Sequence, residues 1–174
     1  MLTSYRITFA AMAIAAAGLV AGCGKSSVPQ EAAVPSAEGA AYRLATEPAG
    51  AKGVKEARAD VKDAEEVTIV GRIGGEANPW VEGQAAFVVM DSVLKPCGAD
   101  EGCPTPWDCC CDPNLSPETK AMVKIVDGSG KTVALDAKTL LGVKELQTVV
   151  VRGRAKRDEA GNLTVLADGV FVRN

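Results

Sequence analysis

The chain has 174 residues, of which 47% are hydrophobic and 24% are charged, and its formal net charge is −3. This composition is typical of a globular protein, and the length suits one domain with additional segments. The acidic balance and the 4% aromatic content provide no long-range attraction for phosphate backbones and few platforms for stacked bases, so we expect no nucleic-acid binding.

The N-terminus predicts export and lipid attachment. Residues 1–22 begin with a short, positively charged stretch and continue with apolar residues 7–21, which are too few for a comfortable membrane span and typical of a secretory signal peptide. The tetrapeptide Val20-Ala21-Gly22-Cys23 closely resembles the lipobox of bacterial lipoproteins. That resemblance implies cleavage before Cys23 and a diacylglyceryl group on its sulfur, while Gly24, in place of an aspartate, implies transfer to the outer membrane. We therefore expect a lipid-anchored protein of the cell envelope that faces the periplasm. The alternative is an ordinary signal peptide followed by a chance cysteine.

Residues 23–64 are predicted to be a flexible tether. They are rich in Ala, Gly, Pro, Ser and Glu, and their large apolar side chains are few, with Tyr42 and Leu44 the most prominent. Such a segment buries too little surface to offset the entropy of ordering it. Val54 and Val61 are seven residues apart, but two valines do not make the core-facing side of a helix.

From residue 67 the sequence reads as short strands with one helical interruption. The expected strands are 67–73, 85–90, 121–126, 132–135, 149–155 and 163–172, and the expected helix is 136–146, with Asp136 as its N-cap. This succession suggests a small Greek-key barrel. The stretches "VTIVGRI" and "VVVRGRA" align at Gly71 and Gly153, and a glycine inside an apolar strand usually marks a bulge or bend.

The order of these elements resembles the OB-fold over residues 67–174. The resemblance implies a mainly β, OB-fold-like Greek-key barrel with one short helix. The chain departs from a plain OB-fold by a Cys- and Pro-rich insertion at residues 92–120. A nucleic-acid role does not follow, because acidic side chains outnumber basic ones from residue 67 onward. The local basic cluster Arg152, Arg154, Lys156 and Arg157 is interpreted as the solvated face of a strand.

Five of the six cysteines lie in the insertion, with the spacing C-x5-C-x5-C-C-C: Cys97, Cys103, Cys109, Cys110 and Cys111. The spacing contains no C-x-x-C motif, and the chain has no histidine, which excludes Ser-His-Asp and Cys-His catalysis. Three interpretations remain: a disulfide staple, a thiolate metal site and a reactive thiol.

Disulfides fit an exported, core-poor, proline-rich loop. Adjacent cysteines rarely bond to each other, so the expected pairs join Cys97 and Cys103 to two members of the triple cluster. The alternative is that four or five of these thiolates hold zinc or another soft metal, because one cysteine is left over from any disulfide pairing. No other cofactor is expected.

The stretch C-P-T-P-W-D-C-C-C, residues 103–111, is similar to a C-P-T-P-W-D-x-C-C motif of bacterial OB-like envelope lipoproteins. In that family the position of Cys109 usually holds another residue. The resemblance therefore implies that Cys110 and Cys111 are the two that pair with Cys97 and Cys103, and that Cys109 is the free thiol. It implies a fold and a location but no chemistry. Trp107 is expected to be a hydrophobic plug that packs the loop onto the barrel, with an exposed contact as the alternative.

Two function classes follow. The first is a non-catalytic, membrane-anchored binding module whose barrel face and stapled loop contact an envelope protein, a peptide or a glycan. The second is a thiol-dependent envelope protein that binds metal or exchanges disulfides. An enzyme that uses carboxylates alone ranks below both, because no acidic pair is fixed by spacing.

Overall fold

The computed structural model describes residues 34–98 and 100–173. The predicted signal peptide at 1–22, the lipid-attachment site Cys23 and the first part of the predicted tether lie outside the described residues. Within the described part of the chain, no helix has both the length and the apolar character needed to cross a bilayer.

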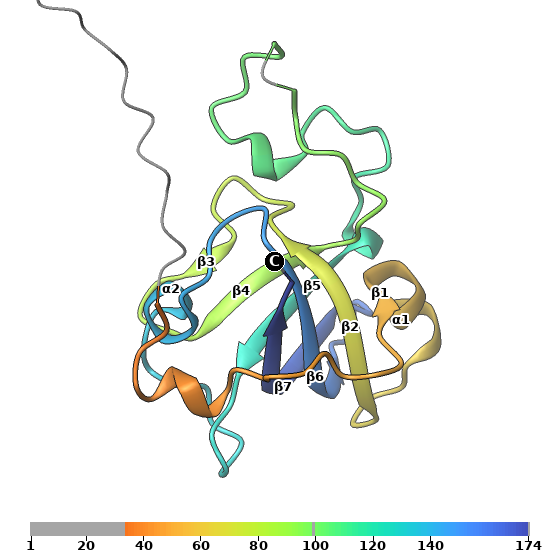
Figure 1. The fold of residues 1–174 in the computed structure, drawn as a ribbon. Coiled ribbons are helices and arrows are strands. Elements are labelled where there is room, and N and C mark those ends of the chain that lie inside the picture. Colours follow the sequence, from red (N-terminus) through yellow and green to blue (C-terminus); the bar gives the residue numbers. More distant parts are fainter. Residues whose placement is uncertain (1–33, 99, 174) are drawn as a thin grey trace, which may run out of the picture. The chain divides into compact units, whose positions relative to one another are not determined.

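Five strands close into a barrel (Figure 1). They are β2 (Glu66–Ile73), β4 (Ala86–Met90), β5 (Lys120–Ile125), β6 (Thr148–Arg157) and β7 (Leu163–Val172). Strand β2 pairs with β6, β6 with β7, β5 with β4, and β4 returns to β2, all antiparallel, while β5 and β7 run parallel. This order confirms the OB-fold-like Greek-key barrel. Two short strands extend the sheet, β1 (Lys52–Gly53) beside β2 and β3 (Trp80–Val81) beside β4.

Alternation of side chains builds the core. Along β2 and β5 every second residue is buried, because successive side chains of a strand point to opposite faces. The inward side chains include Ile69, Phe87 and Val123, all fully buried in one cluster. Strand β4 is buried along its whole length, and its last residue, Met90, belongs to a second, smaller cluster with Leu94 and Cys109. Covering of β4 on both sides explains its nearly continuous apolar sequence.

The helix between β5 and β6 lies where the sequence predicts it but is shorter. Helix α2 spans Ala137–Leu141 and ends at Gly142, which adopts a left-handed conformation with φ of 64°. Asp136 occupies the N-cap position without capping the helix; its carboxylate accepts a hydrogen bond from the backbone N–H of Gly83 at 2.8 Å. The predicted strand at 132–135 is reduced to an isolated bridge between Val126 and Thr132.

The two glycines of the repeated strand motif have different roles. At Gly153 the register between β6 and β7 shifts, and an added Cβ would collide with the carbonyl oxygen of Leu166, so this glycine forms the predicted bulge. No register shift is recorded at Gly71. There a Cβ would lie 2.9 Å from the Met90 carbonyl oxygen and 3.1 Å from a methyl group of Val54. Gly71 therefore permits close packing rather than a bend.

The prediction of a flexible tether is wrong for the part of the segment that the structure describes. A 3-10 turn η1 (Gly39–Ala41), strand β1 and helix α1 (Val54–Asp60) all precede the barrel and pack against it. Val54 and Ala57 are fully buried in the main core, and Tyr42 packs at its edge. The backbone takes part as well, since Leu44 donates its N–H to the Val170 carbonyl at 2.9 Å.

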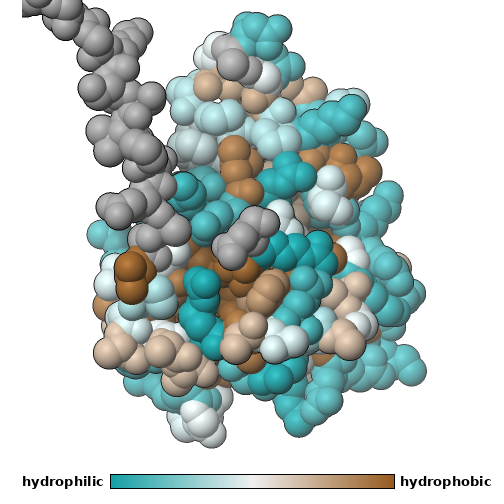
Figure 2. All heavy atoms as spheres, in the orientation of Figure 1, coloured by the Kyte–Doolittle hydropathy of each residue, from teal (hydrophilic) through white to brown (hydrophobic). Residues whose placement is uncertain are grey.

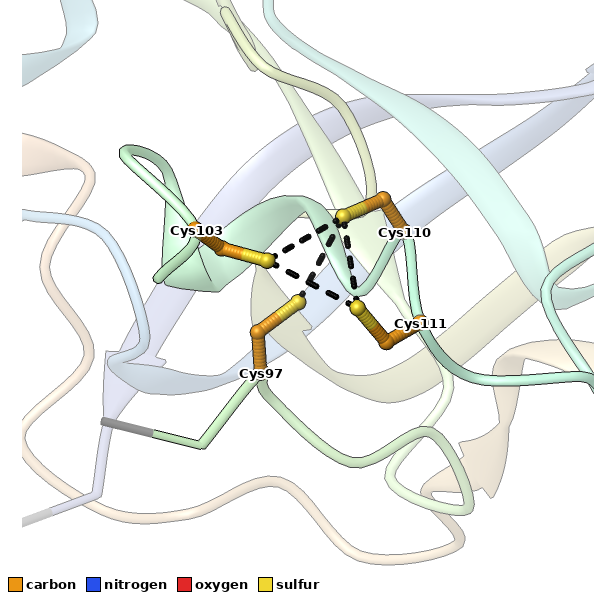
Figure 3. Close-up of side chains that lie close together, drawn as sticks. All are labelled: Cys97, Cys103, Cys110 and Cys111. Atoms are coloured by element: carbon orange, nitrogen blue, oxygen red, sulfur yellow. Dashed lines mark hydrogen bonds between the residues drawn. The ribbon is translucent and has the colours of Figure 1, made fainter. Parts of the chain in front are cut away.

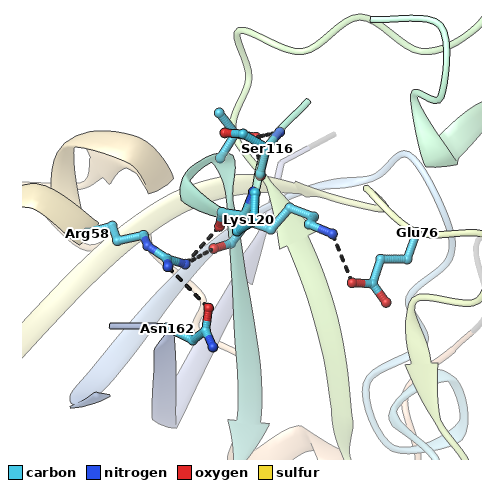
Figure 4. Close-up of polar contacts among 7 residues, drawn as sticks. Arg58, Glu76, Ser116, Lys120 and Asn162 are labelled. Atoms are coloured by element: carbon cyan, nitrogen blue, oxygen red, sulfur yellow. Dashed lines mark hydrogen bonds and ion pairs between the residues drawn. The ribbon is translucent and has the colours of Figure 1, made fainter. Parts of the chain in front are cut away.

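Contacts from distant parts of the chain order this segment. Asp91, at the end of β4, accepts the backbone N–H of Lys55 in the first turn of α1 at 2.8 Å. Further along the helix, the guanidinium of Arg58 donates to the Pro117 carbonyl at 2.7 Å and to the Asn162 side chain at 3.1 Å (Figure 4). These partners lie far away in the sequence, so composition alone gave no sign of them.

Candidate metal centre

The Cys-rich insertion follows β4 and returns to the barrel at β5. In Figure 1 it extends beyond one end of the barrel, and it contains two single-turn 3-10 helices, η2 (Pro106–Asp108) and η3 (Pro117–Thr119). Apart from these turns it has no regular secondary structure between residues 91 and 119 in the part that is described. Its shape therefore depends on a small number of specific contacts.

Trp107 attaches the insertion to the loop between β2 and β3. Its carbonyl oxygen accepts the backbone N–H of Gly75 at 2.8 Å, and its indole Nε1–H donates to the Ala77 carbonyl at 3.1 Å. The side chain is half-buried and belongs to neither hydrophobic cluster. Trp107 thus anchors the loop mainly through hydrogen bonds rather than as an apolar plug.

Cys109 attaches the insertion to the end of β4. It adopts a left-handed conformation with φ of 55°, it is fully buried, and its Sγ lies 3.2 Å from Sδ of Met90. Burial raises the pKa of this thiol to about 11. Cys109 is therefore a neutral packing residue that points into the second hydrophobic cluster, whereas the neighbouring Cys110 and Cys111 are exposed.

The other four cysteines of the insertion converge on one point (Figure 3). Sγ of Cys110 lies 3.5 Å from Sγ of Cys103, 3.6 Å from Cys97 and 3.8 Å from Cys111. Cys103 and Cys111 are 3.6 Å apart, and all four sulfurs lie within 4.8 Å of one another. We call Cys97, Cys103, Cys110 and Cys111 the thiol cluster. It is the group within the described residues whose ligand atoms lie close enough together to hold one metal ion.

The expected disulfides are absent among the described cysteines, all of which are free thiols. Four of the six sulfur separations are 3.5–3.8 Å, far longer than a disulfide bond of about 2.05 Å. They match a different geometry. A tetrahedral zinc ion with Zn–S bonds of about 2.3 Å places its sulfurs about 3.8 Å apart. The thiol cluster therefore has the dimensions of a four-cysteine metal site rather than of a staple.

Hydrogen bonds within the cluster shift the pKa values of three of its thiols in different directions. The pKa of Cys97 is lowered, chiefly by a backbone hydrogen bond from Cys111. The pKa of Cys103 is raised to about 11, chiefly by its hydrogen bond with Cys97, and the pKa of Cys110 is raised chiefly by its hydrogen bond with Cys103. Four like groups so close together resist simultaneous ionisation, and a bound cation would remove that penalty.

Asp108 organises the backbone around the cluster. Its carboxylate accepts the Thr105 hydroxyl at 2.6 Å and the backbone N–H of Cys110 at 2.9 Å, and the Thr105 hydroxyl is the main cause of its lowered pKa. The same carboxylate lies 3.7 Å from Sγ of Cys97. This acidic side chain holds the turn that carries two ligands and adds negative charge beside them, which favours a cation.

The remaining predicted groups do not form a site with the cluster. Arg152 pairs with Asp168 at 2.8 Å, and Arg154 lies 3.7 Å from Glu66, so both are part of a solvated strand face. The large apolar side chains exposed in the described residues are Val34 and Val93. Hydrophilic side chains cover most of the face in Figure 2, between separate apolar patches.

The sequence matches no family model and no curated protein. Among solved structures, the chain is similar to the OBody AM1L10 bound to hen egg-white lysozyme, with 12% identity, a TM-score of 0.40, and coverage of 75% of this chain and 98% of that one. Because the likeness is weak, we base the fold on the strand order alone.

Proposed function

We propose that the thiol cluster binds one zinc ion, or another soft metal ion, as a tetrathiolate site that fixes the insertion on the end of the barrel. The observation that carries the proposal is the convergence of four sulfurs within 4.8 Å of one another, with four of their six separations at 3.5–3.8 Å, close to the value for a tetrahedral ion. Thiolates select soft ions such as zinc over magnesium or calcium. The site has four protein ligands, so it leaves no coordination position for a substrate and is structural rather than catalytic.

A bound metal would stabilise an insertion that has too few buried apolar side chains to hold one conformation. The second hydrophobic cluster, with Met90, Leu94 and Cys109 buried and Leu115 and Leu146 at its edge, is small for a loop of this length. A segment with so little core normally needs a disulfide or a metal to hold one conformation. Zinc bound to four thiolates contributes its binding free energy directly to the order of the loop.

The wider role that we propose is a non-catalytic binding module anchored at the cell envelope. The lipobox ending at Cys23 supports the anchor and the outer-membrane location, and the OB-fold-like barrel with its metal-held loop supports the binding role. Its partner would be an envelope protein, a peptide or a glycan. Anchoring is independent of the metal proposal and has its own test.

Metal analysis of the purified protein tests the metal proposal. We expect one zinc per chain, and we expect cobalt, added in place of zinc, to give the intense visible absorption of a tetrahedral thiolate site. Cys110→Ala removes one ligand and should abolish stoichiometric binding. The matched control is the near-isosteric Cys109→Ser, which removes a thiol from the adjacent position outside the cluster, keeps an atom packed toward Met90, and should retain the metal.

Two results would overturn the metal proposal. One is protein that, purified under reducing conditions, takes up neither zinc nor cobalt. The other is equal loss of metal in the Cys109→Ser and Cys110→Ala variants, which would mean that the effect comes from general disruption of the loop.

A further inference from the structure

We infer that the thiol cluster is a redox-controlled metal site, in which oxidation joins its sulfurs in two disulfides, Cys97–Cys110 and Cys103–Cys111, and expels the metal. This inference rests on the proposed function, because it requires a metal on the cluster. It adds a control that the metal proposal does not contain: an oxidant decides whether the site is occupied.

The sulfur positions select these two pairs. A bond between Cys110 and Cys111 is disfavoured, because it joins adjacent residues in a strained ring. Two other ways of pairing the four sulfurs remain. In the pairing that we infer, both partners are already in contact, with Cys97 and Cys110 at 3.6 Å and Cys103 and Cys111 at 3.6 Å. The other pairing contains one such contact, Cys103 with Cys110 at 3.5 Å, and joins Cys97 to Cys111, whose sulfurs lie within 4.8 Å of each other.

The ligands are accessible to an oxidant. Cys110 and Cys111 are exposed and Cys103 is half-exposed, so attack does not require the barrel to open. A cavity of about 290 Å³ lies beside the cluster and is lined by Cys97 and Cys111 together with Lys95 and Glu101. It provides a second approach for a small oxidant. Cys109, in contrast, is fully buried against Met90 and is protected from oxidation.

The fold allows the change without unfolding. Each sulfur pair must close by about 1.5 Å to reach a disulfide bond length. The insertion is joined to the barrel by Trp107 and Cys109, neither of which belongs to the cluster, so these attachments persist while the sulfurs move. The core of the barrel contains none of the four cysteines.

The oxidation balances with a peroxide as oxidant. Each disulfide forms when two thiolates lose two electrons, and hydrogen peroxide takes up these electrons with two protons to give two waters. Two peroxides therefore convert four zinc-bound thiolates into two disulfides, consume four protons, form four waters and leave Zn²⁺ free in solution. Reduction by a dithiol regenerates the thiols and transfers the disulfide to the reductant.

The test uses the zinc-loaded protein, hydrogen peroxide and a chromophoric zinc indicator. We expect release of one zinc per chain in parallel with the loss of four titratable thiols, followed by peptide mapping that identifies the two named disulfides. A dithiol reductant with added zinc should restore binding. The near-isosteric Cys109→Ser variant, which keeps an atom packed toward Met90, should release zinc to the same extent, because its missing thiol takes no part.

Three outcomes would overturn the inference: zinc retained after a peroxide treatment that oxidises the cluster thiols of the zinc-free protein, zinc released with sulfinic acids instead of disulfides, or a disulfide that includes Cys109. Each of these requires a protein that binds zinc first. Failure to bind zinc at all under reducing conditions would instead refute the proposed function, so the two failures are distinguishable.

Discussion

Replacing Val54 with alanine tests whether the segment before the barrel belongs to the folded unit. Val54 is fully buried, and one of its methyl groups lies 3.1 Å from the position that a Cβ on Gly71 would take, so the side chain packs directly on strand β2. Alanine removes two methyl groups at about 0.8 kcal/mol each, and the residual cavity adds to the loss. We expect the free energy of unfolding to fall by about 2–3 kcal/mol.

Urea denaturation followed by far-ultraviolet circular dichroism measures this loss as a shift of the midpoint by about 1 M or more. The matched control is Val93→Ala, since Val93 is 54% exposed and its truncation should change stability by less than about 0.5 kcal/mol. A Val54→Ala variant as stable as the control would refute docking of helix α1 and restore the interpretation of this segment as a free tether.

Other predictions concern the barrel, the cluster and the anchor. Gly153→Ala should destabilise the protein by about 3 kcal/mol or more in the same urea assay, because the added Cβ meets the backbone of Leu166 and Ala167, whereas Gly128→Ala, with open space around it, should have little effect. The raised pKa values of Cys103 and Cys110 keep both thiols protonated at neutral pH, so zinc binding should release at least two protons per zinc and its affinity should fall by about a hundredfold per pH unit on acidification. Chelator competition across neutral pH measures the zinc affinity, and a pH-independent affinity would contradict the prediction. Cys23→Ser should move the protein from the membrane fraction to the soluble fraction, and unchanged membrane retention would exclude the lipobox. The protein should not bind single-stranded DNA at physiological salt; salt-sensitive binding lost in an Arg152→Ala, Arg154→Ala double variant would show the opposite.

The sequence by itself determined the barrel. Its strands are marked by alternation or continuous apolar runs, its turns by glycine and aspartate, and its one helix by position. The boundaries of the five barrel strands could therefore be predicted to within a residue or two. The bulge at Gly153 could be predicted for the same reason, since a glycine inside an apolar strand is a local signal.

The sequence also predicted that Cys109 differs from the other cysteines of the insertion, because the C-P-T-P-W-D-x-C-C motif has no cysteine at its position. The positions of the cysteines in the sequence do not predict the distances between their sulfurs. The choice between a staple and a metal site depends on whether the sulfurs lie about 2 Å or nearly 4 Å apart, and only the folded loop, held by Trp107, Asp108 and Cys109, sets that distance.

Whether residues 34–64 are ordered was decided by the tertiary structure alone. Their composition contains too little apolar surface for an independent fold, which is why a tether was expected. On the barrel, however, a few buried side chains suffice, because β2 supplies a partner for β1, Asp91 accepts a backbone N–H of α1, and Arg58 reaches carbonyls near β5. These contacts join residues far apart in the chain, and a segment that folds only against a preformed surface leaves no periodic signal in its own sequence.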